Sequence, residues 1–396
     1  MKENLALLIA LTCLVFSSLS LLSITALYGL FLSACRKLFG VARTEKTAPP
    51  TLPTVSVLVP AYNEESGIVQ KIGDLLKLEY PPQLLEIVVA DDGSSDRTAT
   101  LARELAASAP NRNLKVVSSA HGGPAAALKQ ATLLTSSDYV VWTDADATVG
   151  LDSVRRGLEY FSDNGVGAIF GRTRSGTSGF GPSNRRRELN ARNVIRGLES
   201  DLGSTYYTNG NFFMFRGKDK AIVDGTAINY DSQMAVNIAL QGTRVVFAPD
   251  IEIVHPDPEG FLVYLRRRRR ILVGVLQSSR SSCGLLLRKN RKLIETVIVM
   301  RSFLLYPVLP LVAWAGLISA IAAIILVAGS VFALAALGVG LALIVLALEL
   351  ESWRVTDIPF WIVREGIALL SMVVAYLDYA KVISGQYTYV GGRDQA

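Results

Sequence analysis

The sequence predicts an α/β domain with parallel strands and crossover helices, carried between membrane-spanning segments. Short β-branched runs alternate with amphipathic stretches in the middle of the chain, and charge-free apolar runs lie near both ends. Acidic residues follow several of the predicted strands. The parts that we expect are an anchor over 1–44, the α/β domain over 45–256, basic interface helices over 257–300 and a membrane region over 301–396.

The first expected element is an apolar anchor. Residues 5–31 carry no charge, and this run exceeds the roughly 20 residues that a membrane-spanning helix needs. A cleaved signal peptide would have a shorter apolar core and a small-residue cleavage site, so an uncleaved anchor is the better interpretation. Arg36, Lys37 and Arg43 follow the run, and the positive-inside rule places the next segment in the cytoplasm.

Strands and helices then alternate along the middle of the chain. The strands are expected over 55–60, 86–90, 114–118 and 138–143, and the helices after Glu64, from Ser95 and after Pro124. This alternation is typical of parallel strands joined by crossover helices. In such sheets ligands bind outside the carboxyl ends of the strands, so those ends are the place to look for a site.

Three of the four predicted strand ends carry acidic residues. They are Glu64 after the first strand, Asp91 and Asp92 after the second, and Asp144 and Asp146 after the fourth. Aspartates also serve as ordinary helix caps and turn residues, but capping alone hardly explains acids gathered at one edge. Asp144 and Asp146 are two residues apart on an extended segment, so both side chains point to the same side. Their carboxylates repel each other unless a positive charge lies between them.

The C-terminal part is first basic and then apolar. The net charge of +6 comes largely from 266–301, which precedes a charge-free run over 303–348 that is long enough for two spans. A third candidate span covers 358–377. A juxtamembrane basic stretch facing anionic lipid headgroups explains the charge better than nucleic-acid binding does. We therefore expect a multi-pass protein of the cell membrane with a cytoplasmic α/β domain and no nucleic-acid partner.

Four motifs, taken in order, resemble one family. VSVLVPAYNEE (55–65), VVADDGSSD (88–96), DADA (144–147) and the later acid Asp231 are similar to the membrane-bound glycosyltransferases of family 2. That group includes cellulose, chitin and hyaluronan synthases, ceramide glucosyltransferase and polyprenyl-phosphate sugar synthases. The resemblance implies a nucleotide-sugar-binding domain of GT-A type with a mixed, mainly parallel sheet, accompanied by transmembrane and amphipathic interface helices.

The resemblance also implies roles for individual residues. Asp231 would be the general base, and Asp144 and Asp146 would hold Mg²⁺ or Mn²⁺ against the diphosphate of the donor. The implied donor contacts, with uracil the commonest base, are Pro60, Ala61, Tyr62, Glu64, Asp91, Asp92, Asp144, Lys129 and Arg270. The implied acceptor contacts are Asn209, Gly210, Asn211 and Arg267.

The sequence departs from the family pattern at several positions. Pro124 stands where the family often has a lysine, with Lys129 as the candidate substitute. The arginine motif near the membrane has Arg267 in place of glutamine and Ile271 in place of tryptophan. The arginines of 266–270 cover every side of a helix, so a membrane-surface helix and a phosphate contact both remain open. A lone histidine at a domain boundary, such as His255, is more often structural than a metal or acceptor contact.

These residues predict an inverting glycosyl transfer. A divalent cation can stabilise the leaving diphosphate without a proton, and a single carboxylate suffices as base for the acceptor hydroxyl. One direct displacement inverts the anomeric carbon and needs no second carboxylate. We expect transfer from a nucleotide sugar, with UDP the expected nucleotide, to a membrane-associated lipid or lipid-linked glycan. The alternatives are a processive polysaccharide synthase and a nucleotide-sugar-binding scaffold without activity.

Overall fold

The computed structural model describes residues 28–42, 44–176, 182–256, 261–287, 295–297 and 299–300. Within these ranges, no helix is both long enough and apolar enough to cross a bilayer. The spans predicted over 303–348 and 358–377, and nearly all of the one predicted over 5–31, lie outside the described residues.

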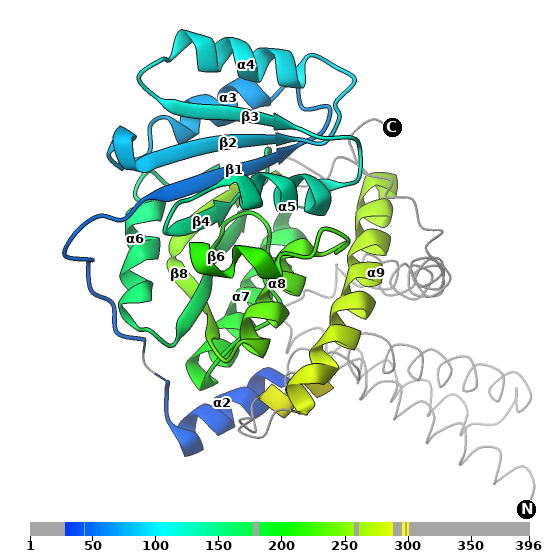
Figure 1. The fold of residues 1–396 in the computed structure, drawn as a ribbon. Helices are drawn as coiled ribbons and strands as arrows, with labels where there is room; N and C mark the ends of the chain where they lie inside the picture. Colours follow the sequence, from blue (N-terminus) through cyan, green and yellow to red (C-terminus); the bar gives the residue numbers. More distant parts are fainter. Residues whose placement is uncertain are drawn as a thin grey trace, which may run out of the picture.

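A mixed sheet of eight strands forms the centre of the described part of the chain (Figure 1). The strands are β1 (Val55–Ala61), β2 (Leu85–Asp91), β3 (Asn113–Ser118), β4 (Tyr139–Trp142), β5 (Thr148–Val149), β6 (Val166–Ser175), β7 (Phe213–Arg216) and β8 (Arg244–His255). Their order across the sheet is β3-β2-β1-β4-β7-β6-β8-β5. The first four in sequence run parallel, β7 is antiparallel to both of its neighbours, and β6 and β8 are parallel to each other. The predicted α/β class is confirmed.

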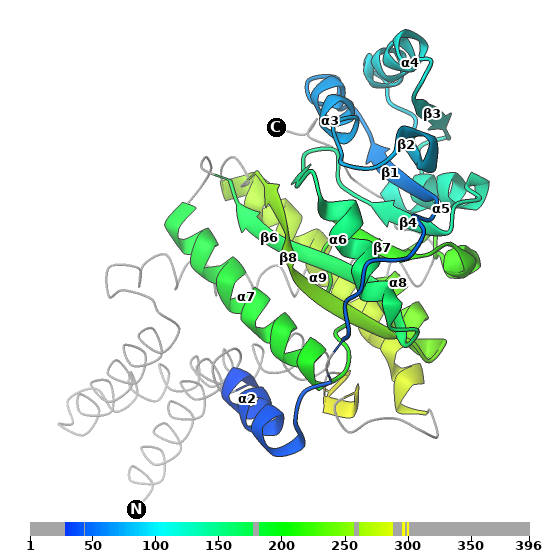
Figure 2. The same cartoon turned by 90° about the vertical axis from the view of Figure 1, so that its left-hand side faces the viewer.

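Helices cover both faces of this sheet (Figures 1 and 2). They are α2 (Tyr28–Phe39), α3 (Ile68–Leu75), α4 (Thr98–Ser108), α5 (Pro124–Leu134), α6 (Ser153–Glu159), α7 (Pro182–Leu202), α8 (Tyr230–Leu240) and α9 (Phe261–Leu286), with 3₁₀ turns η2 (Pro82–Leu84), η3 (Tyr160–Ser162) and η4 (Gly217–Ile222). In β1, Val57 and Val59 belong to the core shared with α3 and α6, whereas Leu58 belongs to the core shared with α5 and α8. The two-residue period of a strand lets β1 serve both cores.

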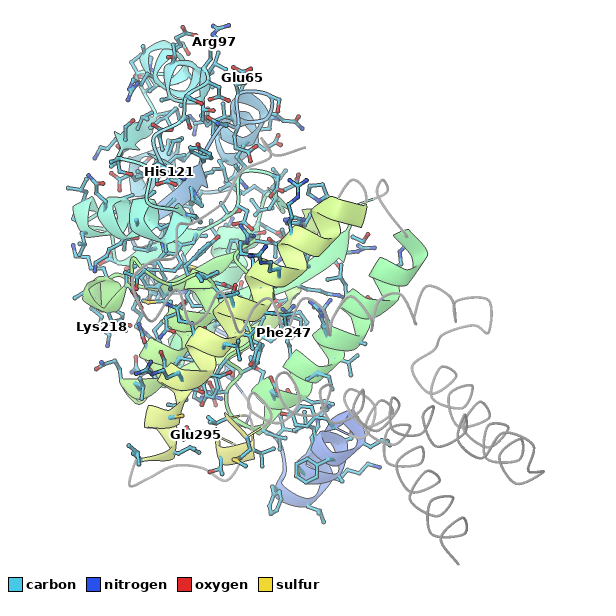
Figure 3. All side chains as sticks on the ribbon, turned by 90° about the vertical axis from the view of Figure 1, so that its right-hand side faces the viewer. Glu65, Arg97, His121, Lys218, Phe247 and Glu295 are labelled. Atoms are coloured by element: carbon cyan, nitrogen blue, oxygen red, sulfur yellow. The ribbon has the colours of Figure 1, made fainter. Side chains whose placement is uncertain are left out.

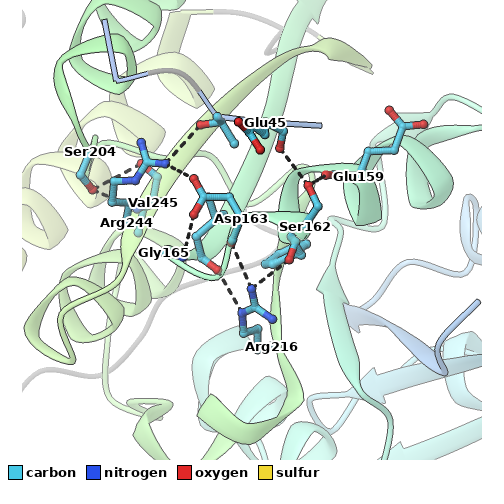
Figure 4. Close-up of polar contacts among 12 residues, drawn as sticks. Glu45, Glu159, Ser162, Asp163, Gly165, Ser204, Arg216, Arg244 and Val245 are labelled. Atoms are coloured by element: carbon cyan, nitrogen blue, oxygen red, sulfur yellow. Dashed lines mark hydrogen bonds and ion pairs between the residues drawn. The ribbon is translucent and has the colours of Figure 1, made fainter. Parts of the chain in front are cut away.

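A cluster of polar side chains lies at the end of the sheet where β4, β6 and β8 begin (Figure 4). Arg216 donates to the carbonyl oxygens of Val166 and Phe161 at 3.0 and 3.1 Å. Arg244 forms an ion pair with Asp163 at 2.5 Å. These arginines tie β7 and β8 to the segment that enters β6, so this edge is occupied by the protein's own groups. The opposite edge, at the carboxyl ends of β1, β2 and β4, carries the acidic residues.

A basic helix lies within the range 257–300 where interface helices were expected. This helix, α9, buries Leu272 and Val273, and its location on a bilayer surface stays a prediction. Gly274 lies so close to the start of α8 that an added Cβ would lie 2.3 Å from Cγ of Asn229. One side of α9 therefore packs against the N-terminus of α8, and α9 lies on the outer side of that helix (Figure 3).

Candidate active site

The carboxyl ends of three parallel strands meet at one edge of the sheet. Ala61 of β1 is in register with Asp91 of β2, and Leu58 of β1 is in register with Trp142 of β4. The amide of Thr143 then donates to the carbonyl of Leu58 at 3.1 Å, so the chain leaves β4 beside β1. This register gathers at one edge the acids that follow β2 and β4.

The two aspartates after β4 meet a histidine from the end of β8. One side-chain ligand atom from each of Asp144, Asp146 and His255 lies within 4.8 Å of the other two. The short strand β5 causes this meeting, because Thr148 pairs antiparallel with Val254 next to His255. His255 was expected to be structural, and the structure instead places it with both aspartates.

The hydrogen bonding of His255 favours a metal-binding tautomer. Its Nδ1 lies 2.7 Å from the carbonyl oxygen of Pro256. A carbonyl oxygen only accepts, so Nδ1 carries the hydrogen and Nε2 presents a lone pair. Burial lowers the pKa of His255, and the nearby Arg267 lowers it further, so the ring is neutral near pH 7. Neutral imidazole is the form that binds metals.

The contact between His255 and Asp146 is therefore not an ion pair. Nε2 of His255 lies 3.3 Å from Oδ1 of Asp146, and neither atom of the neutral ring and carboxylate can donate to the other. A cation bound by both would take the lone pair of Nε2 that now accepts from Nη2 of Arg267 at 3.4 Å. Two carboxylates suit Mg²⁺ or Mn²⁺ when phosphate oxygens complete the shell, and an imidazole ligand favours the transition-metal ion Mn²⁺ over Mg²⁺. The donor set thus fits the divalent cation that the sequence predicted.

A buried lysine lies beneath the loop that carries the two aspartates. Nζ of Lys71, on α3, donates to Oγ1 of Thr143 at 2.9 Å and to the carbonyl of Ala147 at 2.5 Å. The Thr143 hydroxyl in turn donates to the carbonyl of Asn211 at 2.7 Å. Burial lowers the pKa of Lys71 to about 8, opposed by the charges of Asp144 and Asp146. The amine of Lys71 therefore donates hydrogen bonds to Thr143 and Ala147, the two ends of the loop that carries Asp144 and Asp146.

Asp231 lies in the first turn of α8 on the other side of Asp144. Its Oδ2 accepts a hydrogen bond from Oγ1 of Thr208 at 2.9 Å. Burial raises the pKa of Asp231, and the hydrogen bond from Thr208 partly offsets that rise. The preceding residue, Tyr230, donates from its hydroxyl to Oδ1 of Asp144 at 2.5 Å. Tyr230 thus joins the metal-ligand candidate Asp144 to the helix turn that holds the base candidate.

The turns after β1 and β2 interlock at the predicted donor side. Asn63 adopts a positive φ of 52°, and its Oδ1 accepts from the amide of Ser95 at 2.8 Å. The amide of Glu64 donates to Oγ1 of Thr98 at 2.7 Å. The ring of Tyr62 stacks on His121 with centroids 4.3 Å apart, in the half of the molecule that contains β1, β2 and α4 (Figure 3). These contacts build a rigid wall beside Asp91.

Asp91 and Asp92 differ in their surroundings, although both were predicted to contact the donor. The side chain of Asp91 accepts from the amide of Ser94 at 3.1 Å. Asp92 accepts from the amides of Gly122 and Gly123 at 2.8 and 2.9 Å and is almost fully buried. Those bonds anchor the loop that precedes Pro124 and α5. Asp92 therefore shapes the loop, and its expected contact with the donor stays a prediction.

Other predicted donor contacts lie in varied positions. Pro60 and Ala61 end β1, and Ala61 is buried, with its carbonyl accepting from the amide of Asp92 at 2.9 Å. Lys129 lies on the exposed side of α5, where its aliphatic chain packs against Gly225. Arg270, on α9, lies close enough to Tyr230 that its charge lowers the pKa of that hydroxyl, against the larger rise from burial. Arg270 is thus beside the acid cluster.

The four residues predicted to contact the acceptor lie in different surroundings. Asn211 is buried, and its Nδ2 donates to Oγ1 of Thr173 at 3.1 Å, so this side chain is used within the fold rather than exposed to an acceptor. Asn209 donates to the carbonyl of Gly171 at 3.0 Å. Gly210 lies against Tyr230 and Asp144. Nη2 of Arg267 lies 3.4 Å from Nε2 of His255, which places Arg267 at the metal side.

Four residues of this site were not predicted for it. They are Lys71, His121, Tyr230 and His255. Only Lys71 had a recognisable signal, because it shares the buried face of α3 with Ile68, Ile72 and Leu75. A lysine within an apolar stripe is unusual and indicates a buried partner.

Comparisons with known proteins agree with this geometry. Residues 56–223 match the family Glycosyl transferase family 2. A beta-monoglucosyldiacylglycerol synthase of Trichormus variabilis is 34% identical over 163 residues, which cover 41% of this chain and 34% of that protein. A poly-beta-1,6-N-acetyl-D-glucosamine synthase of Staphylococcus aureus is 29% identical over 203 residues, which cover 49% of this chain and 48% of that protein. The matched regions thus span between a third and a half of these relatives.

A solved structure shares the fold. The mannosyltransferase of Pyrobaculum calidifontis, determined in complex with GDP-Man and Mn²⁺, superposes with a TM-score of 0.75 and 24% sequence identity. The match covers 93% of this chain and 99% of that one. At this level of identity the likeness shows the fold, and the predicted GT-A-like α/β fold with a mixed sheet is confirmed.

Proposed function

We propose that this chain, whose residues 56–223 form a glycosyltransferase family 2 domain, transfers a sugar from a nucleotide-sugar donor to a membrane-associated lipid or lipid-linked glycan. The transfer is a single inverting displacement that requires Mg²⁺ or Mn²⁺. The protein is a multi-pass protein of the cell membrane, and its α/β domain faces the cytoplasm.

One observation carries this proposal. Asp144 belongs to a cluster that could hold a metal ion, with Asp146 and His255, and it is also joined through Tyr230 to the helix turn that carries the buried carboxylate of Asp231. A site that only bound a nucleotide sugar would not need the buried carboxylate of Asp231. Asp231 is not a member of the cluster formed by Asp144, Asp146 and His255, so the arrangement separates a leaving-group side from a base side.

The residues of this chain divide the work between those sides. Asp144, Asp146 and His255 would hold the cation, which when bound neutralises charge on the departing diphosphate. Asp231 accepts the proton of the acceptor hydroxyl, and its raised pKa strengthens it as a base while it is ionised. Thr208 donates to Oδ2 of Asp231, and the backbone amide of Ser232 also donates to this carboxylate, so both hold it in place. The wall formed by Tyr62 and His121 beside Asp91 is suited to a nucleoside.

A lipid acceptor is supported by the relatives and by the ends of the chain. The Trichormus relative is named for the synthesis of monoglucosyldiacylglycerol, and the Staphylococcus relative for the synthesis of a polysaccharide. Apolar runs over 5–31 and 303–348 flank the domain in sequence. We favour single transfer to a lipid, with diacylglycerol as the first acceptor to test.

The test is a transfer assay with the purified full chain in detergent. UDP-glucose, UDP-N-acetylglucosamine and GDP-mannose are each offered with Mn²⁺ and either diacylglycerol or a total lipid extract, and the products are analysed by mass. One added sugar on a lipid supports the proposal. A ladder of sugars would support the processive alternative, and neither product nor donor hydrolysis with any donor would support a scaffold.

Asp231→Asn tests the base at nearly constant shape. Loss of a general base typically lowers the rate by roughly 10²–10⁴-fold. Asp219→Asn is the matched control, because burial also raises the pKa of Asp219, but that residue lies in η4. Transfer should collapse in Asp231→Asn and persist in Asp219→Asn. Equal transfer by the two variants would refute the role of Asp231.

A further inference from the structure

We propose that Tyr230 is a positioning residue that fixes the orientation of Asp144 for the divalent cation. The inference rests on the proposed function, because it concerns the same site. Its physical basis is one short hydrogen bond, together with the packing that leaves the tyrosine hydroxyl no room to move.

The hydrogen bond settles which oxygen of Asp144 faces which neighbour. The Tyr230 hydroxyl donates to Oδ1 of Asp144 at 2.5 Å. A carboxylate that receives a donor at one oxygen loses rotational freedom about its Cβ–Cγ bond, so Oδ2 also takes a defined direction. Partners that hydrogen-bond to metal ligands commonly orient those ligands and tune their affinity for the metal.

The ring of Tyr230 is held from one side by the sheet. It packs edge-on against Trp142, with ring centroids 5.8 Å apart and planes at 73°. Trp142 is fully buried and donates from Nε1 to Oγ1 of Thr132 at 3.1 Å. Because Trp142 is the last residue of β4 and Asp144 follows shortly after it, the tyrosine ring and its hydroxyl contact the same short segment.

The loop before β7 closes over the hydroxyl. An added Cβ at Gly210 would lie 2.5 Å from the Tyr230 hydroxyl oxygen and 3.2 Å from Oδ1 of Asp144. The distance to the hydroxyl oxygen is too short for a carbon atom and the distance to Oδ1 is tight, so a side chain at this position would displace the Tyr230 hydroxyl. Because Gly210 has no side chain, the loop before β7 can cover the hydrogen bond between Tyr230 and Asp144.

The backbone of Tyr230 is fixed from the opposite side. Nδ2 of the preceding residue, Asn229, donates to the carbonyl of Ile271 on α9 at 3.0 Å, and Gly274 of α9 packs against Asn229. Helix α9 thus sets the place where α8 begins. Because the Tyr230 hydroxyl donates to Asp144, the position at which α8 begins also fixes the carboxylate of Asp144, in the loop after β4.

Titration of the full chain with Mn²⁺ alone tests the inference. Bound Mn²⁺ is measured by loss of the free-ion signal in electron paramagnetic resonance, so no donor or acceptor has to be identified. Tyr230→Phe removes the hydroxyl and keeps the ring against Trp142. We expect Mn²⁺ to bind about tenfold more weakly, or worse, as is typical when a group that orients a metal ligand is lost. Asp146→Ala defines the binding that remains without the site.

Tyr160→Phe is the matched control. It also removes a tyrosine hydroxyl that donates to a carboxylate, that of Asp250, and it leaves the residues of the site unchanged. Gly210→Ala is the second variant, because it displaces the Tyr230 hydroxyl without removing it and carries the test if Tyr230→Phe does not fold. It should weaken Mn²⁺ binding in the same direction.

The outcomes separate the inference from the proposed function. Weaker Mn²⁺ binding by Tyr230→Phe than by Tyr160→Phe supports the inference. Equal binding by Tyr230→Phe and the unmodified chain, with binding lost in Asp146→Ala, overturns the inference and leaves the metal site standing. An unmodified chain that binds no more Mn²⁺ than Asp146→Ala overturns the metal site and the inference together.

Discussion

Replacing Lys71 with methionine should change how the stability of the protein depends on pH. Methionine keeps a long side chain in the same buried space but removes the charge and both hydrogen bonds, to Thr143 and to the carbonyl of Ala147. Burial lowers the pKa of Lys71 from 10.5 to about 8. At 1.36 kcal/mol per pH unit, this difference corresponds to roughly 3 kcal/mol in the free energy of unfolding.

The sign follows from proton binding. Between pH 8 and 10.5 the unfolded chain keeps the Lys71 proton while the folded chain has lost it. The unfolded state binds more protons in this window, so the contribution of Lys71 to the free energy of unfolding rises with pH. Below pH 8 both states are protonated and the full cost of burying the charge opposes folding. The unmodified protein should therefore gain up to roughly 3 kcal/mol relative to Lys71→Met between pH 7 and 10.5.

Urea unfolding of both full chains at pH 7 and at pH 10 measures this gain. EDTA is added, because a cation beside Asp144 and Asp146 would shift the titration of Lys71. Lys220→Met is the control, since Nζ of Lys220 also donates to a backbone carbonyl, that of Thr135 at 2.7 Å, from a more exposed position. A difference between the unmodified chain and Lys71→Met that is the same at both pH values would refute the reasoning.

Three further predictions address the site and the packing of the sheet. Because burial raises the pKa of Asp231 and the base must be ionised, kcat/KM should fall as the pH is lowered, with a midpoint above the usual value of about 4; a midpoint below 4 would contradict this. His255→Ala should weaken Mn²⁺ binding at least about tenfold by calorimetry, whereas unchanged affinity would remove His255 from the metal site. Gly217→Ala should destabilise the protein by more than about 2 kcal/mol in thermal unfolding, because its Cβ would lie 2.0 Å from the carbonyl oxygen of Ser137. Gly73→Ala, which meets nothing within 4 Å inside α3, should be neutral or stabilising by up to about 1 kcal/mol, and a loss there as large as at Gly217 would show that the clash is not the cause.

The sequence was informative wherever a pattern is local. The strands predicted over 55–60, 86–90, 114–118 and 138–143 are β1 to β4, and no end differs by more than one residue. The antiparallel strand β7 and the parallel pair β6 and β8 had no comparable signal. Their pairing depends on contacts between distant segments, which the alternation of apolar residues does not encode.

The candidate metal ligands also differ in whether a local sequence pattern or a contact between distant segments identifies them. Asp144 and Asp146 were recognised on the expectation of an extended segment. The structure places them instead in a turn after β4, which ends at Trp142, and the amide of Ala147 donates to the carbonyl of Asp144 at 3.2 Å. His255 was assigned a structural role, since its approach to Asp146 requires β5 to pair with the end of β8. The ligand contacts expected for Asp92 and Asn211 stay predictions, because the fold already engages both side chains. Each has hydrogen-bond partners from a distant loop or strand, and those partners occupy the side chain.

What the sequence by itself determined is therefore the α/β class, the strand ends and the pair of carboxylates that needs a positive charge. Only the tertiary structure decided which groups surround Asp144. They are the buried amine of Lys71, the imidazole of His255 and the hydroxyl of Tyr230. Propensity and period act within a few residues of the chain. The balance of charge and hydrogen bonds at a site depends on distances in space, and these are set by sheet register and helix packing.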